Sequence, residues 1–258
     1  MILAIDIGNT NIALGGFCSD KLDFVAHIST DSSKTADEYA SLILNVLSLY
    51  NIERTAVTGA IISSVVPPLN AIIRCAVKLI YGIEPLTVGP GVKTGISIHC
   101  DNPSSVGSDL ICASVAVHNI YGSPALIVDM GTATKITLVD KGGTFSGVSI
   151  MPGLLMGLDA LAEGTAQLPQ VSLEAPPSVI GKNTADCMKS GAVFGHAAMI
   201  DGMIERIILE YGEAIPVYAT GGLAANIVTY CKQNITLDED IVLKGLNIIY
   251  KKNRQTAK

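Results

Sequence analysis

Two short segments of the chain place an aspartate, a glycine and small polar residues directly after an apolar run. They are residues 6–11, Asp-Ile-Gly-Asn-Thr-Asn, and residues 129–134, Asp-Met-Gly-Thr-Ala-Thr. A glycine turn lets backbone N–H groups approach an anion closely, and Asn and Thr side chains add neutral donors. A neighbouring aspartate can hold a hydrated Mg²⁺ that bridges phosphate oxygens. One such turn alone is more typical of an ordinary hairpin, whereas two matching turns indicate a nucleotide held between two lobes.

The two segments are separated by close to half of the 258-residue chain. In each, an apolar strand runs into the glycine turn, and a strand of alternating apolar and polar residues follows, which is typical of a hairpin. Duplication of one α/β unit explains this echo better than chance does. We therefore expect two lobes, residues 1–121 and 122–258, with the seam near residues 121–124.

The elements that must position these turns follow from the periodicity of apolar residues. A capping box at Thr35 and Glu38 predicts the start of a helix, and a break is expected near Gly195 within a long helical segment. Strands that alternate with helices indicate an α/β protein. The remaining predictions are strands at residues 57–66, 86–88 and 217–220, and helices at 70–81, 108–121, 185–211 and 243–253.

Composition excludes several classes of function. The net charge is −6, aromatic residues make up 5% of the chain, Trp is absent, and no basic block precedes residues 251–254. Binding to a nucleic acid needs clustered positive charge, so we expect no such partner. The six cysteines are scattered without a CxxC pair, which favours reduced thiols in a cytoplasmic protein over a zinc site or disulfides. Neither a signal peptide nor a membrane span is expected.

The order and spacing of short motifs along nearly the whole chain resemble the type III pantothenate kinases, of the acetate kinase–sugar kinase–Hsp70–actin superfamily. Neither the GxxxxGKS/T pattern nor a GxGxxG after a strand is present, so other nucleotide-binding loops are not indicated. The matching pieces are residues 6–11, 63–69, 101–103, 106–109, 129–134, 152–153, 160–169, 181–184, 201–202, 220–224 and 237–246.

The resemblance implies a fold, a reaction and partners. The fold is a duplicated actin-like (ribonuclease H-like) α/β ATPase fold, with two similar lobes and the nucleotide cleft between them. The reaction is ATP-dependent phosphorylation of pantothenate to 4′-phosphopantothenate, the first step of coenzyme A biosynthesis. The implied cofactors are ATP–Mg and a monovalent cation, K⁺ or NH₄⁺. The implied assembly is a homodimer with the acceptor pocket near its interface, and the helix at 185–211 is the candidate face.

The resemblance also assigns roles to residues. Asp109 matches the general base, Asp6 the residue that anchors Mg²⁺ through the phosphates, and Asp129 the site of the monovalent cation. Residues matching the ATP contacts are Asp6, Ile7, Gly8, Asn9, Thr10, Asn11, Ile12, Ala13 and Thr132. Residues matching the substrate contacts are Gly107, Ser108, Asp109, Leu110 and Thr184. From the residues alone, Asp109 could equally cap a helix, and Thr184 could be the N-cap of the helix that begins at residue 185.

Two positions depart from the family pattern. Leu110 stands where the family commonly has Arg, and Cys100 where it commonly has Tyr. Arg can bind a carboxylate through two hydrogen bonds and Leu cannot. One lost charge-assisted hydrogen bond removes roughly 1.5–3 kcal/mol. Lys93 or His99 could compensate. Two alternatives therefore stay open: a catalytically weak paralogue that binds ATP or pantothenate, and a kinase of another small hydroxylated acceptor.

Overall fold

The computed structural model describes residues 1–255 of the chain, which divide into two compact units. Unit 1 combines Met1–Tyr121 with the C-terminal residues from Asp240, and unit 2 is Gly122–Glu239. The expected lobe 122–258 is therefore corrected at its end, because the closing helix packs with unit 1. The reason is contact between helices: Gly245 lies against the backbone of Cys112, where a larger residue would collide.

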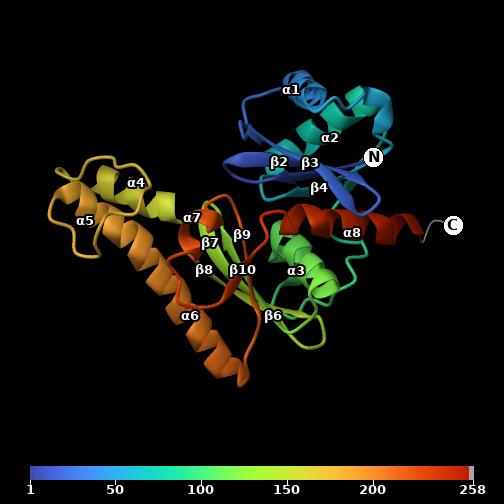
Figure 1. Cartoon of the computed structure of the whole chain (residues 1–258). Helices are drawn as coiled ribbons and strands as arrows, with labels where there is room; N and C mark the ends of the chain where they lie inside the picture. Colours follow the sequence, from blue (N-terminus) through green and yellow to red (C-terminus); the bar gives the residue numbers. More distant parts are fainter. Residues whose placement is uncertain (256–258) are drawn as a thin grey trace. The chain divides into compact units, whose positions relative to one another are not determined.

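Unit 1 is a five-stranded mixed sheet with two helices on each face (Figure 1). Strand β1 (Ile2–Ile7) pairs antiparallel with β2 (Asn11–Cys18) and parallel with β4 (Gly59–Ser64); β3 (Lys21–Ser29) and β5 (Leu86–Thr87) complete the order β3-β2-β1-β4-β5. Helices α1 (Ala36–Leu49) and α2 (Pro67–Tyr81) cover one face, and α3 (Ser108–Ile120) and α8 (Ile241–Gln255) the other. Two short 3₁₀ turns lie at Arg54–Ala56 and Pro103–Ser105.

Local signals explain where the helices of unit 1 begin and end. The capping box is confirmed, because the Thr35 side chain accepts from the N–H of Glu38 and the Glu38 carboxylate accepts from the N–H of Thr35. Helix α2 begins at Pro67, three residues earlier than expected, since a proline fits the first helical turn without losing a hydrogen bond. It ends at Gly82, whose φ of 69° is left-handed.

Unit 2 repeats this topology around a second hairpin. Its sheet has the order β10-β9-β6-β7-β8, with β6 antiparallel to β7 and parallel to β9. The strands are β6 (Ala125–Met130), β7 (Ala133–Val139), β8 (Phe145–Pro152), β9 (Val217–Thr220) and β10 (Ile235–Leu237), and the helices are α4 (Leu154–Gly164), α5 (Thr184–Ser190), α6 (His196–Tyr211) and α7 (Ala224–Val228). Read outward from the hairpin, both sheets have the same neighbours in the same directions, which confirms the expected duplication.

The structure differs from the expected elements in three places. The segment 185–211 is two α-helices joined by a π-helical turn at Gly191–Gly195, so the break expected near Gly195 is a widened turn. Thr184 is the first residue of α5 and not its cap, because the Asn183 side chain accepts from the N–H of Asp186 at 2.9 Å. Strands β3 and β8 were not expected, although Phe24, Ala26 and Ile28 alternate inward along β3.

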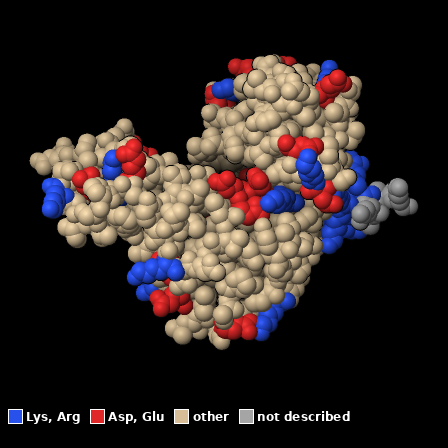
Figure 2. All heavy atoms as spheres, in the orientation of Figure 1, with Lys and Arg blue, Asp and Glu red and all other residues tan. Residues whose placement is uncertain are grey.

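The surface carries its charges in small groups of mixed sign (Figure 2). The basic group beside the C-terminal end of α8 is the clearest on the face shown, and this helix carries Lys251, Lys252 and Arg254. Among residues 1–255, no helix combines the length and the apolar character needed to cross a bilayer.

Candidate functional site

The first glycine loop connects β1 to β2 and is closed by backbone hydrogen bonds. Gly8 N–H donates to the carbonyl of Asn11 at 3.0 Å, and the Gly8 carbonyl accepts from the Thr30 hydroxyl at 2.7 Å. Thr30 N–H donates in turn to the Thr10 carbonyl at 2.9 Å, so the end of β3 fixes the loop from outside. The polar side chains of the loop are exposed, which leaves them available to a ligand: Asn9, Thr10 and Asn11.

The start of helix α3 is fixed to the end of strand β4 by a serine cluster. The Ser108 hydroxyl lies 2.9 Å from the Ser63 hydroxyl, accepts from Ser64 N–H at 2.8 Å and donates to the Ser64 carbonyl at 3.0 Å. Ser63 is the register partner of Asp6 across the parallel β1–β4 pair. Ser108 is buried and its hydroxyl is occupied here, so we expect its predicted substrate contact to come from the backbone at the helix start.

This cluster places Asp109 near the carboxyl end of strand β1, where Asp6 lies. Asp109 lies in the first turn of α3, where its Oδ1 accepts from Leu110 N–H at 2.8 Å. Cys112 lies about one helical turn after Asp109, and its thiol is buried. Burial raises the pKa of this thiol well above the usual value, and the negative charges of Asp6 and Asp109 raise it further. Asp6 and Asp109 therefore form one acidic corner of unit 1. Among residues 1–255 no group of three His, Cys, Asp or Glu side chains could hold a metal ion.

A corner with two carboxylates suits Mg²⁺ held largely by a nucleotide. Mg²⁺ keeps several waters and is usually bound through one or two carboxylates together with substrate phosphates. Asp6, at the carboxyl end of β1 and directly before the exposed loop, fits this donor set.

Four residues bear on the surroundings expected for Asp109. Gly107 and Leu110 lie beside it in the chain, and Lys93 and His99 were the candidates to replace the missing arginine. Gly107 is the N-cap of α3, and a Cβ there would collide with the Asp109 carboxylate, so this glycine leaves room for the acid. The Leu110 side chain is only 7% exposed. Lys93 and His99 are exposed. Compensation for the missing arginine by Lys93 or His99 stays a prediction.

The second glycine loop connects β6 to β7 in unit 2. Gly131 N–H donates to the Ala133 carbonyl at 3.2 Å, and the Met130 carbonyl accepts from Leu223 N–H at 3.2 Å. Gly153 packs against the carbonyl of Thr132, where a larger residue would not fit. The Thr132 side chain is exposed, so the predicted ATP contact is presented to the outside of unit 2.

Asp129 lies beneath this loop and forms an ion pair. Lys135 is its register partner across the β6–β7 hairpin, and Lys135 Nζ is 2.7 Å from Asp129 Oδ2. The two side chains are only 18% and 17% exposed. The other carboxylate oxygen faces the turn after β9, since a Cβ at Gly221 would lie 2.7 Å from Asp129 Oδ1. The carboxylate expected to bind a monovalent cation is thus already paired with an ammonium group.

Thr184 lies apart from the second loop. It is exposed at the start of α5, which Figure 1 shows beside α4 and away from the strands of unit 2. Its predicted role as a substrate contact stays a prediction.

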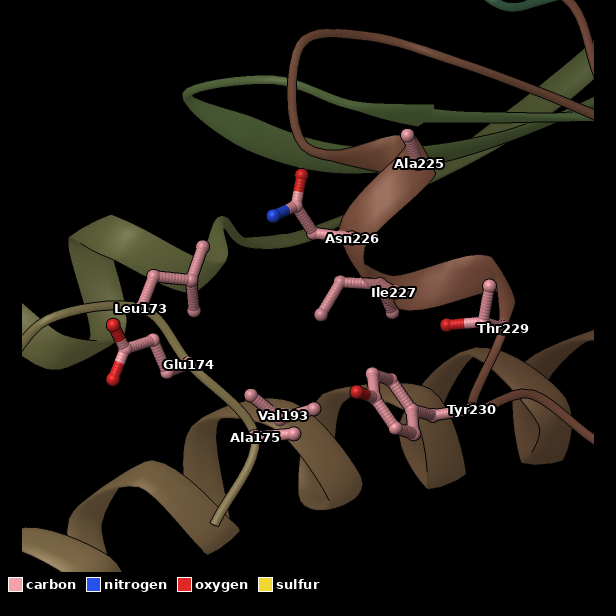
Figure 3. Close-up of a pocket in the computed structure, with 9 residues that line it drawn as sticks. All are labelled: Leu173, Glu174, Ala175, Val193, Ala225, Asn226, Ile227, Thr229 and Tyr230. Carbon is pink, nitrogen blue, oxygen red and sulfur yellow. The ribbon is translucent and has the colours of Figure 1, made fainter.

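Two hollows lie within unit 2. The first, of about 240 Å³, is framed by Val193, Ile227 and the Tyr230 ring, which face one another across it (Figure 3). None of its lining residues is a predicted site residue, and its one carboxylate, Glu174, pairs with Lys189 at 3.0 Å.

The second hollow, of about 250 Å³, is bordered by His196, whose Nε2 lies 2.8 Å from the Thr134 hydroxyl. Burial lowers the pKa of His196.

Three contributors to the site were not identified from the sequence: Thr30, Ser63 and Lys135. The signal for Lys135 was limited to its place in the same hairpin. The structure pairs residues 129 and 135 across a three-residue turn at 131–133, whereas a two-residue turn would have paired 129 with 134. Thr30 and Ser63 act through contacts with residues distant in the chain, for which periodicity carries no signal.

Comparison with known proteins agrees with this architecture. The duplicated actin-like α/β fold is confirmed by solved structures. An activator of 2-hydroxyisocaproyl-CoA dehydratase from Clostridium difficile superposes with a TM-score of 0.57 at 12% identity, covering 99% of this chain and 96% of that one. A ROK hexokinase from Thermus thermophilus gives 0.54 at 14% identity, covering 98% and 99%. At these identities the likeness concerns the fold alone.

Sequence relatives are much more similar. A type III pantothenate kinase of Exiguobacterium sp. is 42% identical over 255 residues, which cover 99% of this chain and 100% of that one. Another, from Moorella thermoacetica, is 40% identical over 253 residues, with 98% and 100% covered. The profile of the family matches residues 2–206. The two glycine loops and the acidic corner fall within this match, and the chain belongs to the type III pantothenate kinase family.

Proposed function

We propose that the acidic corner of unit 1 and the two glycine loops carry out the reaction of the family, the transfer of a phosphoryl group from ATP to pantothenate. The chain is a pantothenate kinase of coenzyme A biosynthesis, since its relatives of that name match it over their full length. The observation that carries the assignment of roles is the serine cluster. It joins the start of α3, which carries Asp109, to the end of β4, where Ser63 is the register partner of Asp6.

Asp6 is the proposed anchor of Mg²⁺. When bound with ATP, the ion neutralises charge on the phosphate oxygens. Asp6 ends a buried strand whose neighbours on both sides are fixed by the sheet, so its carboxylate is held in place before the nucleotide arrives. The exposed Asn9, Thr10 and Asn11 then supply donors to the phosphates from the same loop.

Asp109 is the proposed general base. The pantothenate hydroxyl attacks the γ-phosphorus, the bond from that phosphorus to the bridging oxygen breaks, and the electron pair leaves with ADP. The hydroxyl proton passes to an Asp109 carboxylate oxygen. A carboxylate is basic enough because the hydroxyl becomes acidic as the new bond forms. Leu110 N–H donates to Oδ1 of Asp109 and orients the carboxylate.

Thr132 and the backbone of the second loop are proposed to contact ATP from unit 2. Exposure of the Thr132 side chain and the tight closure of the turn support this role. The expected K⁺ or NH₄⁺ at Asp129 does not fit the Asp129–Lys135 pair, so ATP–Mg is the only cofactor that we propose.

The test of the base is Asp109→Asn, compared with Asp37→Asn. Asp37 is the matched control because it also lies in the first turn of a helix, α1. We expect Asp109→Asn to lower kcat by about 10²–10⁴-fold, the usual contribution of a general base, while both variants keep the wild-type circular dichroism. Formation of 4′-phosphopantothenate, followed by mass spectrometry, is the assay. Turnover by Asp109→Asn within threefold of wild type would reject the assignment.

The proposed substrate contacts are Gly107 and the start of α3 in unit 1 and, separately, Thr184 in unit 2. Because Leu110 is buried and uncharged, it cannot bind the pantothenate carboxylate as an arginine would. Leu110→Arg is expected to lower the KM for pantothenate if the pantothenate carboxylate binds near residue 110. Leu110→Met is the uncharged control. An unchanged KM in both would remove position 110 from the pocket. A panel of hydroxylated acids tests whether another acceptor is preferred.

A homodimer in the cytoplasm completes the proposal. Unit 2 exposes large apolar side chains on and near α4 that a partner could cover: Ile150, Leu155, Met156, Leu161, Val179 and Ile180. The expected face on 185–211 exposes Leu209. Light scattering should give twice the chain mass of 26.9 kDa, and a species at the single-chain mass would contradict the dimer. Six free thiols fit a reducing compartment.

A further inference from the structure

We infer that the ammonium group of Lys135 takes the place of the monovalent cation that the family resemblance implies at Asp129, so that this kinase works without K⁺ or NH₄⁺. The inference rests on the proposed function, because it assigns a role to Asp129 beneath the ATP-binding loop of unit 2. It concerns a positioning residue, since Lys135 acts through Asp129 and the loop.

The pair is built into the hairpin. Residues 129 and 135 are direct cross-strand partners, so their side chains leave the same face of the β6–β7 pair. Register holds them together, because slipping by one residue would turn the inward-facing Ile136 outward. Lys135 is therefore brought to Asp129 whenever the hairpin forms.

The surroundings of Asp129 leave little space for a second cation. Its Oδ2 is 2.7 Å from Lys135 Nζ, which is a direct charge-assisted hydrogen bond. Its Oδ1 lies beside two glycines, because a Cβ at Gly221 would be 2.7 Å from it and a Cβ at Gly131 would be 3.5 Å from it. The strand partner on the other side is Thr220, whose hydroxyl donates to the Glu239 carbonyl at 3.0 Å.

Charge explains why one cation is needed there and two are not. A carboxylate close to bound phosphates repels them, and one positive charge beside it relieves the repulsion. The ammonium of Lys135 has the same charge as K⁺ and the donor chemistry of NH₄⁺. Because both side chains are less than a fifth exposed, salt screens this pair less than it screens a surface pair.

Unit 2 also contains a matched pair for comparison. Lys141 Nζ and Glu213 Oε2 are likewise 2.7 Å apart, but their side chains are 66% and 38% exposed. Removing Lys141 deletes a lysine and an ion pair of the same length without touching the loop. It is therefore the control for Lys135.

The first experiment uses wild-type protein at constant ionic strength. Activity is compared in tetramethylammonium, potassium and ammonium chloride, because tetramethylammonium is too large and too weakly coordinating to replace either ion. We expect rates within twofold of one another. Activation of the wild type fivefold or more by K⁺ or NH₄⁺ would overturn the inference, and this result does not depend on any variant.

The second experiment asks whether removing Lys135 creates a cation requirement. Lys135→Met should lose tenfold or more activity in tetramethylammonium and regain most of it with saturating K⁺ or NH₄⁺. Lys141→Met should show no cation dependence, and the double variant Asp129→Asn/Lys135→Met should show no rescue. A folded Lys135→Met that K⁺ and NH₄⁺ fail to rescue would contradict the inference.

A binding readout separates this inference from the proposed function. The Tm of Lys135→Met should rise in potassium chloride relative to tetramethylammonium chloride, while the Tm of the wild type should not. These shifts decide the cation question even if no phosphorylated product forms, and absence of product in every salt would reject the proposed function alone. A K⁺-specific rise in the wild-type Tm would count against the built-in ammonium.

Discussion

The turns of the hairpins β1–β2 and β6–β7 both begin with Asp-x-Gly but differ in length and in electrostatics. Residues 8–11 separate the paired Ile7 and Ile12, whereas residues 131–133 separate the paired Met130 and Thr134. In each, an aspartate one residue from the strand end precedes a glycine turn, and the turn is closed by a backbone bond from glycine, at 3.0 Å in unit 1 and 3.2 Å in unit 2. The register partner of Asp6 is Ala13, whereas the partner of Asp129 is Lys135. The residue opposite the aspartate thus distinguishes the two hairpins. Ala13 leaves Asp6 without a cross-strand ammonium group, as the proposed Mg²⁺ anchor requires, whereas Lys135 forms an ion pair with Asp129.

The two loops are also held from different sides. Thr30, directly after β3, fixes the first loop through its hydroxyl and N–H. The second loop lies against Gly153 and receives a bond from Leu223 N–H to Met130. The two copies of the framework therefore both contain an Asp-x-Gly turn, but different neighbouring residues hold each turn in place. The substitutions below test whether the two turns respond differently.

The largest effect is expected from Asp6→Asn. Loss of the proposed Mg²⁺ anchor should lower kcat/KM by about 10²–10³-fold, comparable with removing one preorganised electrostatic contact at a transition state. Initial rates over a range of Mg²⁺ concentrations measure it. Asp23→Asn, on the exposed strand β3 of the same sheet, is the control and should leave the rates unchanged. Equal rates for Asp6→Asn and the control would remove Asp6 from the site.

Ala13→Lys tests the difference between the two hairpins directly, because it gives unit 1 the cross-strand lysine of unit 2. The new ammonium should pair with Asp6 and compete with Mg²⁺, lowering kcat/KM about tenfold or more and raising the Mg²⁺ concentration for half activity. Ala13→Met has similar length without charge. If both variants behave alike, bulk at position 13 matters and the charge does not.

A smaller difference should separate the glycines of the two turns. A Cβ at Gly8 would lie 2.9 Å from the Asn11 carbonyl oxygen, whereas at Gly131 the nearest atom is 3.5 Å away, an ordinary contact. We expect Gly8→Ala to reduce kcat/KM for ATP about tenfold and Gly131→Ala by less than about threefold, because only the first must move the loop. Steady-state kinetics with varied ATP decide it, and the reverse order would show that space at the turn is not limiting.

The smallest effect concerns pH. Burial lowers the pKa of His196 in unit 2, so the folded chain resists a proton that the unfolded chain accepts below the usual histidine value near 6.5. Stability is therefore full above that pH and is lost as pH falls. The shifted carboxyl of unit 1, Asp31, has its pKa lowered by Lys34 and Ser33, so its contribution is lost only at far lower pH.

Calorimetry between pH 7.5 and 5.5 tests this difference. We expect Tm to fall by roughly 2–4 °C, the shift that a loss of 1 kcal/mol produces in a chain of this length. His196→Gln should reduce the fall, whereas substitution of the exposed His99 by Gln should not. The same slope in His196→Gln would place the titrating group elsewhere.

Features with a local or periodic origin were predictable from the sequence. The two hairpins, the capping box at Thr35 and the helix that begins at Ser108 depend on residues a few positions apart, and all are present. The actin-like fold followed from the family resemblance and is confirmed. The separate roles expected for Asp6 and Asp109 stay predictions, and only the structure shows the serine cluster that joins their elements.

What the sequence did not reveal depends on contacts between distant residues. The fit of Gly245 against Cys112 decides that α8 belongs to unit 1, and no pattern within either helix shows it. The ion pair of Asp129 is intermediate, because it depends on local hairpin register, but a turn shorter by one residue would have paired Asp129 with Thr134. The monovalent cation expected at Asp129 stays a prediction of the family resemblance, and only the structure shows the lysine beside it.

The return of α8 to unit 1 also sets the order in which the chain can fold during synthesis. Unit 2 is one continuous stretch, Gly122–Glu239, and is complete before α8 leaves the ribosome. Until then, unit 1 exposes the apolar face of α3 that Leu243, Leu246 and Ile249 cover. Unit 1, which carries Asp6 and Asp109, is thus finished only after α8 has been translated.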